Sequence, residues 1–359
     1  MYQLVVTAIA AICLASESGA EDETERTDTR CRSHEAAPAI GHALQGDAAL
    51  ARDLLLELPS DGLPDECQAF RACMIDRFDP ENPGYAAEAD AGFTDWLLAR
   101  YRAYWNALFT GSQEAELLEA ALEDAVRGEM AARGIEDISD LAWPAELHAR
   151  AISEIEAEGH YAIMGITGTV HDLMVWRSQE EEIRTVELPE STQEVRVVFM
   201  DDFASRGWIS YASCSARNVG GWAREDGLFA VVPSYDSLEG EEFEVNFLAH
   251  EAQHFADYAQ WNELESWHLE YRAKLTELTL ANSTMEKTLT RFYEDRSDNP
   301  ALPHSYANAR VIAELEERLG IDNARGLMNA DLERIHAAAR ILLNEDSASL
   351  AAARHGPEN

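Results

Sequence analysis

The residues best suited to chemistry lie in one short stretch, His250-Glu-Ala-Gln-His254. Histidines four positions apart share one face of a helix, so both imidazoles can bind the same metal ion. This H-E-x-x-H pattern is typical of zinc sites in which the histidines hold the metal and the glutamate between them handles the proton of an activated water. The stretch therefore predicts a hydrolytic zinc site with His250 and His254 as ligands and Glu251 as general base.

The residues around this motif favour a helix. Upstream, Phe243, Phe247 and Leu248 continue a helical apolar pattern. Glu241 and Glu242 stand at its start, where acidic side chains suit the positive end of the helix dipole. Downstream, after a short break, residues 264–278 form a second run with helical periodicity. The sequence thus predicts two consecutive helices, the first of which carries the motif.

An H-E-x-x-H helix followed by a glutamate on the next helix resembles the gluzincin class of zinc metallopeptidases. Several gluzincin families have E-x-x-A followed by Asp or Asn on the second helix, and here Glu270-Tyr-Arg-Ala273 is followed by Lys274. The resemblance covers about residues 195–310. It implies Zn²⁺ as cofactor, Glu270 as third ligand and a peptide or protein as substrate. Lys274 departs from the pattern.

Other third ligands remain open. Glu265, His268 and Glu277 also lie on or beside the second helix. A metzincin would need Gly at position 257 and His at position 260, where this chain has Asp257 and Gln260. That class is therefore excluded.

Two later residues are candidates for a catalytic role that the resemblance implies. Zincins often bring a His or Tyr from a later segment to stabilise the developing oxyanion, which here indicates His304 or Tyr306. The alternative for both is a helix terminus in contact with solvent. Asp257 either orients a ligand imidazole or is an exposed helix residue.

The first residues predict export. Residues 4–15 form an apolar run with the length of a signal-peptide core, which is too short to span a bilayer. Ser18-Gly-Ala20 is suitable for cleavage, although no Lys or Arg precedes the core. We therefore expect an exported protein, periplasmic or extracellular.

Four cysteines remain after removal of this segment: Cys31, Cys67, Cys73 and Cys214. Disulfides persist in exported proteins, so an even number predicts disulfide bonds. Four cysteines allow three pairings, among which the sequence does not choose. Five residues separate Cys67 from Cys73 and no second pair lies close by, which argues against a zinc site there.

Composition excludes several classes of partner. Of the 28 basic residues, only Lys274 and Lys287 are lysines, and the net charge is −39 over 359 residues. Such a surface repels nucleic acid and anionic membranes. We expect no nucleic-acid partner and no stable membrane insertion, and the oligomeric state is not indicated. A hydrophobic content of 46% is enough for a sizeable core or two lobes.

The order of patterns predicts an α+β protein. We expect a signal peptide (1–20), a flexible acidic leader (21–37), a helical N-terminal region (38–180), a zincin-like metallopeptidase domain (181–345) and a polar tail (346–359). Alternating residues predict strands at 185–188, 194–200 and 227–233. The resemblance implies that this small sheet lies over the motif helix, with a helical C-terminal part after it.

The leading hypothesis is an exported zinc metallopeptidase. Two alternatives remain: a non-catalytic binding or structural protein with a degenerate zincin fold, and a zinc hydrolase that acts on a non-peptide amide or ester. Substrate specificity and physiological role are not indicated by the sequence.

Overall fold

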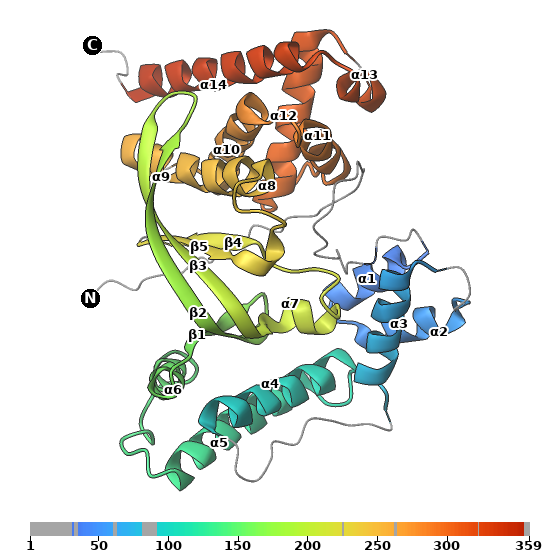
Figure 1. The fold of residues 1–359 in the computed structure, drawn as a ribbon, viewed down its shortest axis with the longest axis vertical. Helices are drawn as coiled ribbons and strands as arrows, with labels where there is room; N and C mark the ends of the chain where they lie inside the picture. Colours follow the sequence, from blue (N-terminus) through green and yellow to red (C-terminus); the bar gives the residue numbers. More distant parts are fainter. Residues whose placement is uncertain are drawn as a thin grey trace. The chain divides into compact units, whose positions relative to one another are not determined.

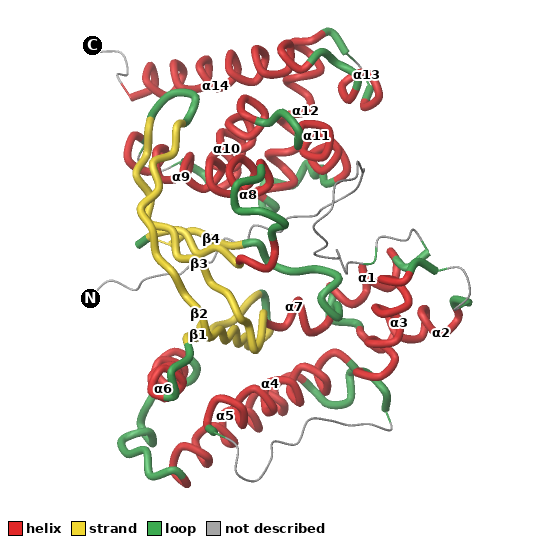
Figure 2. The backbone as a smooth tube through the Cα atoms, viewed as in Figure 1, coloured by secondary structure: helices red, strands yellow, loops and turns green. Residues whose placement is uncertain are grey.

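The chain has a mixed α+β fold, as predicted, with many helices and a five-stranded sheet (Figures 1 and 2). The computed structural model describes residues 31, 35–59, 63–80, 92–224, 226–261, 264–321 and 323–354. The predicted signal peptide (1–20) and most of the predicted acidic leader lie outside the described residues. Among the described helices, none combines the length and the apolar character that crossing a membrane requires.

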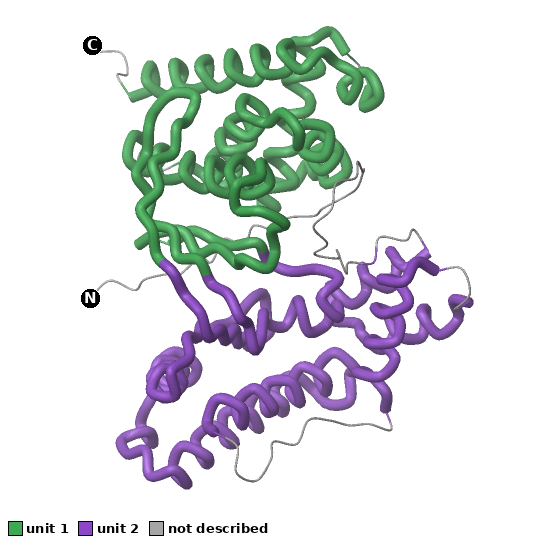
Figure 3. The backbone as a smooth tube through the Cα atoms, in the orientation of Figure 1, with its two compact units in different colours: residues 1–22, 181–199, 220–359 green, residues 23–180, 200–219 purple. Residues whose placement is uncertain are grey.

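The described residues divide into two compact units (Figure 3). Unit 1 contains the described residues of 181–199 and 220–359, and unit 2 those of 23–180 and 200–219. Strands β2 (Val170–Glu187) and β3 (Thr192–Arg206) each contribute residues to both units. The two units are described separately below.

Unit 2 is mainly helical and has its own hydrophobic core. A row of aromatic side chains is buried there, with Tyr101, Tyr104 and Trp105 at most 6% exposed. Strand β1 pairs antiparallel with β2, Tyr161 opposite Trp176. Besides parts of β2 and β3, the unit contains α1 (Ala37–Leu44), α2 (Ala48–Glu57), α3 (Asp65–Arg77), α4 (Phe93–Phe109), α5 (Ala115–Ala132), α6 (Ala145–Ala157), β1 (Tyr161–Thr167) and α7 (Gly207–Ala212).

Two disulfide bonds hold unit 2 together, which confirms the prediction of disulfides and resolves their pairing. Cys31 is bonded to Cys67, and Cys73 to Cys214. The second bond joins positions 141 residues apart in sequence. By closing long loops, such bonds reduce the conformational freedom of the unfolded chain.

Unit 1 contains the motif helix and most of the later helices. Helix α10 lies against α9, α12 and α14 (Figure 1). Helix α12 begins with Pro303 at its first turn and ends at Gly320, whose φ of 67° is left-handed, as helix ends favour. The elements after β3 are β4 (Gly221–Arg224), β5 (Gly227–Val231), η1 (Val232–Ser234), α8 (Glu241–Phe243), η2 (Glu244–Ala249), α9 (His250–Gln260), α10 (Ser266–Leu280), α11 (Met285–Glu294), α12 (Pro303–Leu319), α13 (Ala324–Met328) and α14 (Leu332–Arg354).

The sheet has the strand order β1-β2-β3-β5-β4 and begins earlier in the chain than predicted. Strand β1 starts at Tyr161, inside the region expected to be helical. The sequence Tyr161-Ala-Ile-Met-Gly-Ile-Thr167 is apolar almost throughout, so it lacks the alternation that identifies a half-buried strand. The predicted strands near 185, 194 and 227 all lie within strands of the structure.

The edge strand β4 and the residues that lead into the motif helix pack tightly. A Cβ atom at Gly221 would lie 2.6 Å from the ring of Phe247, so only glycine fits there. Phe247 belongs to a π-helical turn, η2, that continues directly into α9. The same hydrophobic cluster contains Val197, Leu228 and Ala252, which join β3, β5 and α9. The sheet thus supports one side of the motif helix.

The predicted polar tail is partly wrong. Helix α14 extends to Arg354, and Asp346 and Ser347 within it bind the side chain of Arg272. Three polar side chains around the start of the predicted tail, Glu345, Asp346 and Ser347, have partners on other elements.

Candidate metal centre

The motif histidines share one face of α9, as the sequence predicts. The ring centroids of His250 and His254 lie 5.0 Å apart, and the ring planes are at 88°. Both residues are buried, at 5% and 4% exposure. Two imidazoles in this arrangement leave space between their edges for a common third group.

Helix α10 supplies that third group, Glu270. Its Oε2 lies 3.5 Å from His250 Nε2, and its Oε1 lies 3.4 Å from His254 Nε2. One ligand atom from each of the three residues lies within 4.8 Å of the other two, and the three side chains are buried. Within the described residues, these three side chains form a cluster of histidine and acidic groups that could hold a metal ion.

The hydrogen bonding of these side chains fits a bound cation. Both ring nitrogens of His254 and Oε2 of Glu270 are buried without a hydrogen-bond partner in the described structure. Burying polar atoms in this way costs free energy unless another group satisfies them. A cation among the three ligand atoms would satisfy one nitrogen of His254 and the carboxylate of Glu270, although the second nitrogen of His254 would keep no partner in the described structure. The residues present therefore fit a metal ion.

Nearby charges determine the protonation of the two groups at the centre. Burial alone would lower the pKa of His250, but the carboxylates of Glu270 and Glu277 outweigh it and raise the pKa to about 10. Burial opposes ionisation of Glu270, but its contacts with His250, His254 and His304 hold its pKa well below the usual value. A proton and a metal ion therefore compete for His250 Nε2.

Glu277 orients the first histidine. Its Oε1 lies 2.7 Å from Nδ1 of His250. Its Oε2 accepts hydrogen bonds from Asn246, at 2.8 Å, and from Arg291. Burial raises the pKa of Glu277, but the charge of Arg291 and the contact with His250 outweigh it and lower the pKa to about 2. An ionised Glu277 keeps a proton on Nδ1, so Nε2 is the nitrogen of His250 that can give up its proton and bind a metal ion.

His268 and Glu265, which the sequence also allows as third ligands, have partners elsewhere. Nε2 of His268 lies 2.8 Å from Asp346 Oδ1, and its ring stacks on Trp267. Glu265 is exposed and accepts a hydrogen bond from the indole of Trp267. Of the four candidate side chains, Glu270 is thus the one that faces both histidines.

Lys274 occupies the position where the resembled families have Asp or Asn. It is buried, with Nζ 3.9 Å from Glu270 Oε2 and 4.7 Å from the ring centroid of Phe292. Burial lowers its pKa, while the charges of Glu270 and Glu277 oppose this shift. Glu270, Lys274 and Glu277 are spaced four and three apart, so they share one face of α10. Glu277, whose Oε1 lies 2.7 Å from His250 Nδ1, is three residues beyond Lys274.

Glu251, the predicted general base, lies on α9 beside this group and is only 2% exposed. Burial raises the pKa of its carboxyl; the positive charges of His254 and His250 oppose this shift, and the negative charge of Glu270 adds to it. Asp257 is also buried and accepts a hydrogen bond from Arg272 at 2.8 Å. Asp257 is therefore not the exposed helix residue that was one of its two interpretations.

The two residues considered for oxyanion stabilisation lie in different surroundings. His304 is 33% exposed, and its Nδ1 is 2.7 Å from Glu270 Oε2, without the angles of a hydrogen bond. Tyr306 is two residues further along α12, so it points away from His304. Its ring packs edge-on against Trp267, with centroids 5.3 Å apart. The structure thus brings His304, and not Tyr306, to Glu270.

Sequence reasoning did not find the residues that support the centre. Glu277 was considered only as a ligand, and Asn246 and Arg291 were not considered. Tyr258 is 55% exposed; burial of its hydroxyl raises its pKa, and the charges of Glu270 and Glu251 raise it further. The sequence could have indicated that Tyr258 lies near the centre, because it is four residues from His254 and so shares a helix face with it.

No family model matches the chain, and no curated protein or solved structure is significantly similar to it.

Proposed function

We propose that this chain is an exported zinc-dependent metallopeptidase of the gluzincin type. His250, His254 and Glu270 would hold the metal, and Glu251 would act as general base. The observation that carries this proposal is the convergence of three buried side chains, two of which, His254 and Glu270, have polar atoms without hydrogen-bond partners in the described structure. The H-E-x-x-H order then gives the neighbouring glutamate its role.

The spacing of the three side chains supports zinc. Zinc binds histidine nitrogen and carboxylate oxygen at about 2.0–2.2 Å in tetrahedral sites. Two such ligands are then about 3.4 Å apart, from the geometry of a tetrahedron with those bond lengths. Glu270 Oε2 lies 3.5 Å from His250 Nε2 and Glu270 Oε1 lies 3.4 Å from His254 Nε2, so each of these separations is close to one edge of such a tetrahedron. Three protein ligands leave a fourth position open, as in catalytic zinc sites.

The residues around the centre suggest the course of the reaction. When bound, zinc supplies a Lewis acid that polarises the scissile carbonyl and makes water nucleophilic at neutral pH. Glu251 lies about 100° around α9 from His250 and would accept the proton of the attacking water and pass it to the leaving amine. His304, one-third exposed beside Glu270, is the group we assign to stabilising the oxyanion.

Export and substrate class form part of the proposal. The apolar segment 4–15 and the two disulfide bonds are compatible with an exported protein, periplasmic or extracellular. We propose a peptide or protein as substrate because the resemblance to gluzincins implies it. The net charge of −39 argues against nucleic acid as a partner.

The test compares three proteins: wild type, Glu251→Gln and the matched control Glu265→Gln. Bound zinc is measured by mass spectrometry, and hydrolysis is measured on casein and on a panel of small amides and esters. We expect about one zinc per chain in all three proteins. Casein hydrolysis should be lost in Glu251→Gln, by at least about 10²-fold, since general base catalysis contributes this much. Glu265→Gln should retain it.

The remaining outcomes would each favour a different function. Zinc binding with hydrolysis of small amides or esters, but not of casein, would replace the peptidase with a hydrolase of non-peptide substrates. Zinc binding without any hydrolysis that depends on Glu251 would favour a binding or structural protein. Absence of zinc from the wild type, even after reconstitution, would refute the proposed centre.

A further inference from the structure

The two motif histidines are held in different ways. Nδ1 of His250 has a direct partner, Oε1 of Glu277, at 2.7 Å. Neither ring nitrogen of His254 has a hydrogen-bond partner in the described structure. Within the described structure, Glu270 Oε1 lies 3.4 Å from Nε2 of this ring but forms no hydrogen bond with it. The direction of the ring therefore depends strongly on how firmly helix α9 itself is held.

The residues that hold α9 near His254 are Gln253 and Asp257, which are four apart and at most 2% exposed. Gln253 Nε2 donates to Asp257 Oδ1 at 2.8 Å. From α10, Thr276 Oγ1 donates to Gln253 Oε1 at 2.9 Å, and Arg272 Nε donates to Asp257 Oδ1 at 2.8 Å. These four residues, which we call the helix clamp, join α9 and α10 at two points one turn apart.

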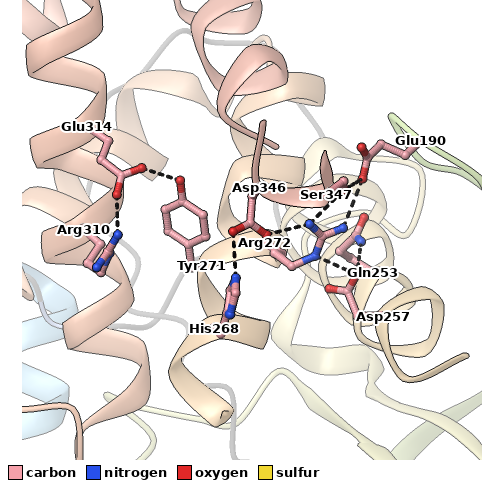
Figure 4. A network of polar contacts seen from close by, with 10 residues as sticks. All are labelled: Glu190, Gln253, Asp257, His268, Tyr271, Arg272, Arg310, Glu314, Asp346 and Ser347. Carbon is pink, nitrogen blue, oxygen red and sulfur yellow. Dashed lines mark hydrogen bonds and ion pairs between the residues drawn. The ribbon is translucent and has the colours of Figure 1, made fainter. Parts of the chain in front are cut away.

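Arg272 is itself fixed from several directions (Figure 4). It is 1% exposed, and Nη1 donates to Asp346 at 2.8 Å and to Ser347 at 3.0 Å, both on α14. Nη2 donates to Glu190, at the turn between β2 and β3, at 3.1 Å. The planar guanidinium has five N–H groups in a fixed arrangement. With partners on α9, α14 and the hairpin turn, it is a rigid support for Asp257.

The clamp and the candidate metal ligand lie on different sides of α10. Glu270 and Arg272 are two residues apart, about 200° around the helix. Ala273 lies between their directions and is fully buried, and a small side chain there allows close approach of α9. Contacts on both sides of Ala273 would prevent α9 from rotating relative to Glu270.

We propose that the helix clamp positions His254, with Arg272 as its anchor, and thereby does for the second histidine what Glu277 does for the first. Arg272 touches none of the three metal-binding side chains, so it is a positioning residue. The inference rests on the proposed metal centre. Residues that orient metal ligands typically change metal affinity about 10–100-fold when replaced.

The test uses mild variants of the full-length protein. Thr276→Val removes the hydroxyl that donates to Gln253 and leaves every charge in place. The separate variant Thr276→Ser keeps a hydroxyl at this position. Arg272→Lys keeps the charge but loses the planar fork. The matched control is Glu314→Gln, since Glu314 binds Tyr271 of α10 and Arg310 but does not reach α9 (Figure 4).

Two quantities are measured for each variant: zinc affinity by competition with a chelator, and the visible absorption spectrum of the Co²⁺-substituted protein. We expect Thr276→Val and Arg272→Lys to weaken zinc binding about tenfold or more and to alter the Co²⁺ spectrum. Thr276→Ser and Glu314→Gln should match the wild type. The Co²⁺ spectrum reports ligand geometry, which a general loss of stability would leave unchanged.

The outcomes separate the clamp from the centre. If the wild type binds both metals and the clamp variants match it in affinity and spectrum, the clamp is refuted and the metal centre stands. If the wild type binds neither metal, the proposed function fails, and the clamp with it. Should Arg272→Lys fail to fold, the pair Thr276→Val and Thr276→Ser still decides the question.

Discussion

Each unit buries a pair of histidines, and the two pairs have almost the same geometry. In unit 1, the rings of His250 and His254 are 5.0 Å apart at 88°. In unit 2, the rings of His148 and His171 are 5.7 Å apart at 87°. All four residues are at most 5% exposed. Ring geometry and burial alone therefore do not distinguish a candidate metal centre from a structural pair.

In the unit 2 pair both Nε2 atoms have protein partners, although His171 Nδ1 has no hydrogen-bond partner in the described structure. Nε2 of His148 lies 3.2 Å from the Tyr101 hydroxyl, and Nε2 of His171 lies 3.1 Å from Glu119 Oε1. The ring of Trp143 packs against both imidazoles, with centroids 4.8 Å away in each case. Glu119 has a side chain 45% exposed, so water solvates it. Here the Nε2 atoms have protein partners and an aromatic ring fills the space.

The difference lies in the third group. In unit 1 a carboxylate that is 2% exposed faces both imidazoles, and His254 has no hydrogen-bond partner within the described structure. A buried carboxylate is costly unless a cation or donors compensate it. A buried acid shared by two imidazoles, and not the imidazole pair, is therefore the feature that makes this group one that could hold a metal ion.

The largest expected effect follows from removing that acid. Glu270→Gln replaces one of three proposed ligands with a neutral amide. We expect zinc affinity to fall on the order of a thousandfold, or about 4 kcal/mol. This is a fraction of the roughly 10–16 kcal/mol of binding free energy typical of structural zinc sites. Glu119→Gln makes the equivalent change beside the unit 2 pair and should leave the affinity unchanged. Competition with a chelator measures both. Equal affinities in the two variants would contradict the distinction drawn between the pairs.

A smaller effect concerns protonation in unit 2. Burial, with a lesser contribution from His171, lowers the pKa of His148 from 6.5 to about 4. As the pH falls from 6.5 toward 4, the unfolded chain takes up a proton that folded unit 2 excludes, so stability decreases. The full difference corresponds to roughly 3 kcal/mol.

Asp172 acts in the opposite sense over nearly the same range. Burial raises its pKa from 3.8 to about 6, despite the hydrogen bonds it accepts, so folded unit 2 gains stability from this group as the pH falls below 6. The contribution of His148 must therefore be taken as the difference between wild type and His148→Leu. From pH 7 to pH 4.5, urea unfolding should show wild type losing about 2 kcal/mol relative to the variant. Parallel pH profiles would show that His148 protonates equally in both states.

Local patterns predicted the core of the candidate site. The spacing of His250, Glu251 and His254 and the apolar periodicity around them predicted a helix, which the structure contains. The resemblance to gluzincins implied Glu270 as the third ligand, with Glu265, His268 and Glu277 left open, and Glu270 does face both histidines. The helix and the shared face of His250 and His254 depend on residues close in sequence, where helical geometry fixes which side chains are neighbours.

The features that sequence did not predict depend on contacts between distant segments. Glu277 lies 27 residues from His250, and its role depends on how α9 and α10 cross. Asp346 was assigned to a polar tail because its partner, Arg272, is 74 residues away. Strand β1 was missed because its residues are apolar on both faces and carry no alternation. Neither local propensity nor periodicity contains this information.

The smallest of these effects tests how unit 1 orients its histidine. In Glu277→Gln, one amide oxygen must replace two acceptors. If the oxygen faces His250, the amide NH₂ faces Arg291 and Asn246, which are donors. If it faces them instead, the NH₂ points at His250 Nδ1, which must then accept, and the proton moves to Nε2, where the metal would bind.

Either arrangement of the amide should weaken zinc binding about 10–100-fold, the range typical of groups that orient metal-binding histidines. The matched control is Glu242→Gln, which breaks the ion pair with Lys287 but leaves the imidazoles unchanged. Chelator competition on wild type and both variants measures the effect. A zinc affinity for Glu277→Gln equal to that of the control would mean that α9 alone holds His250. The first histidine would then resemble the second, which depends on the position of its helix.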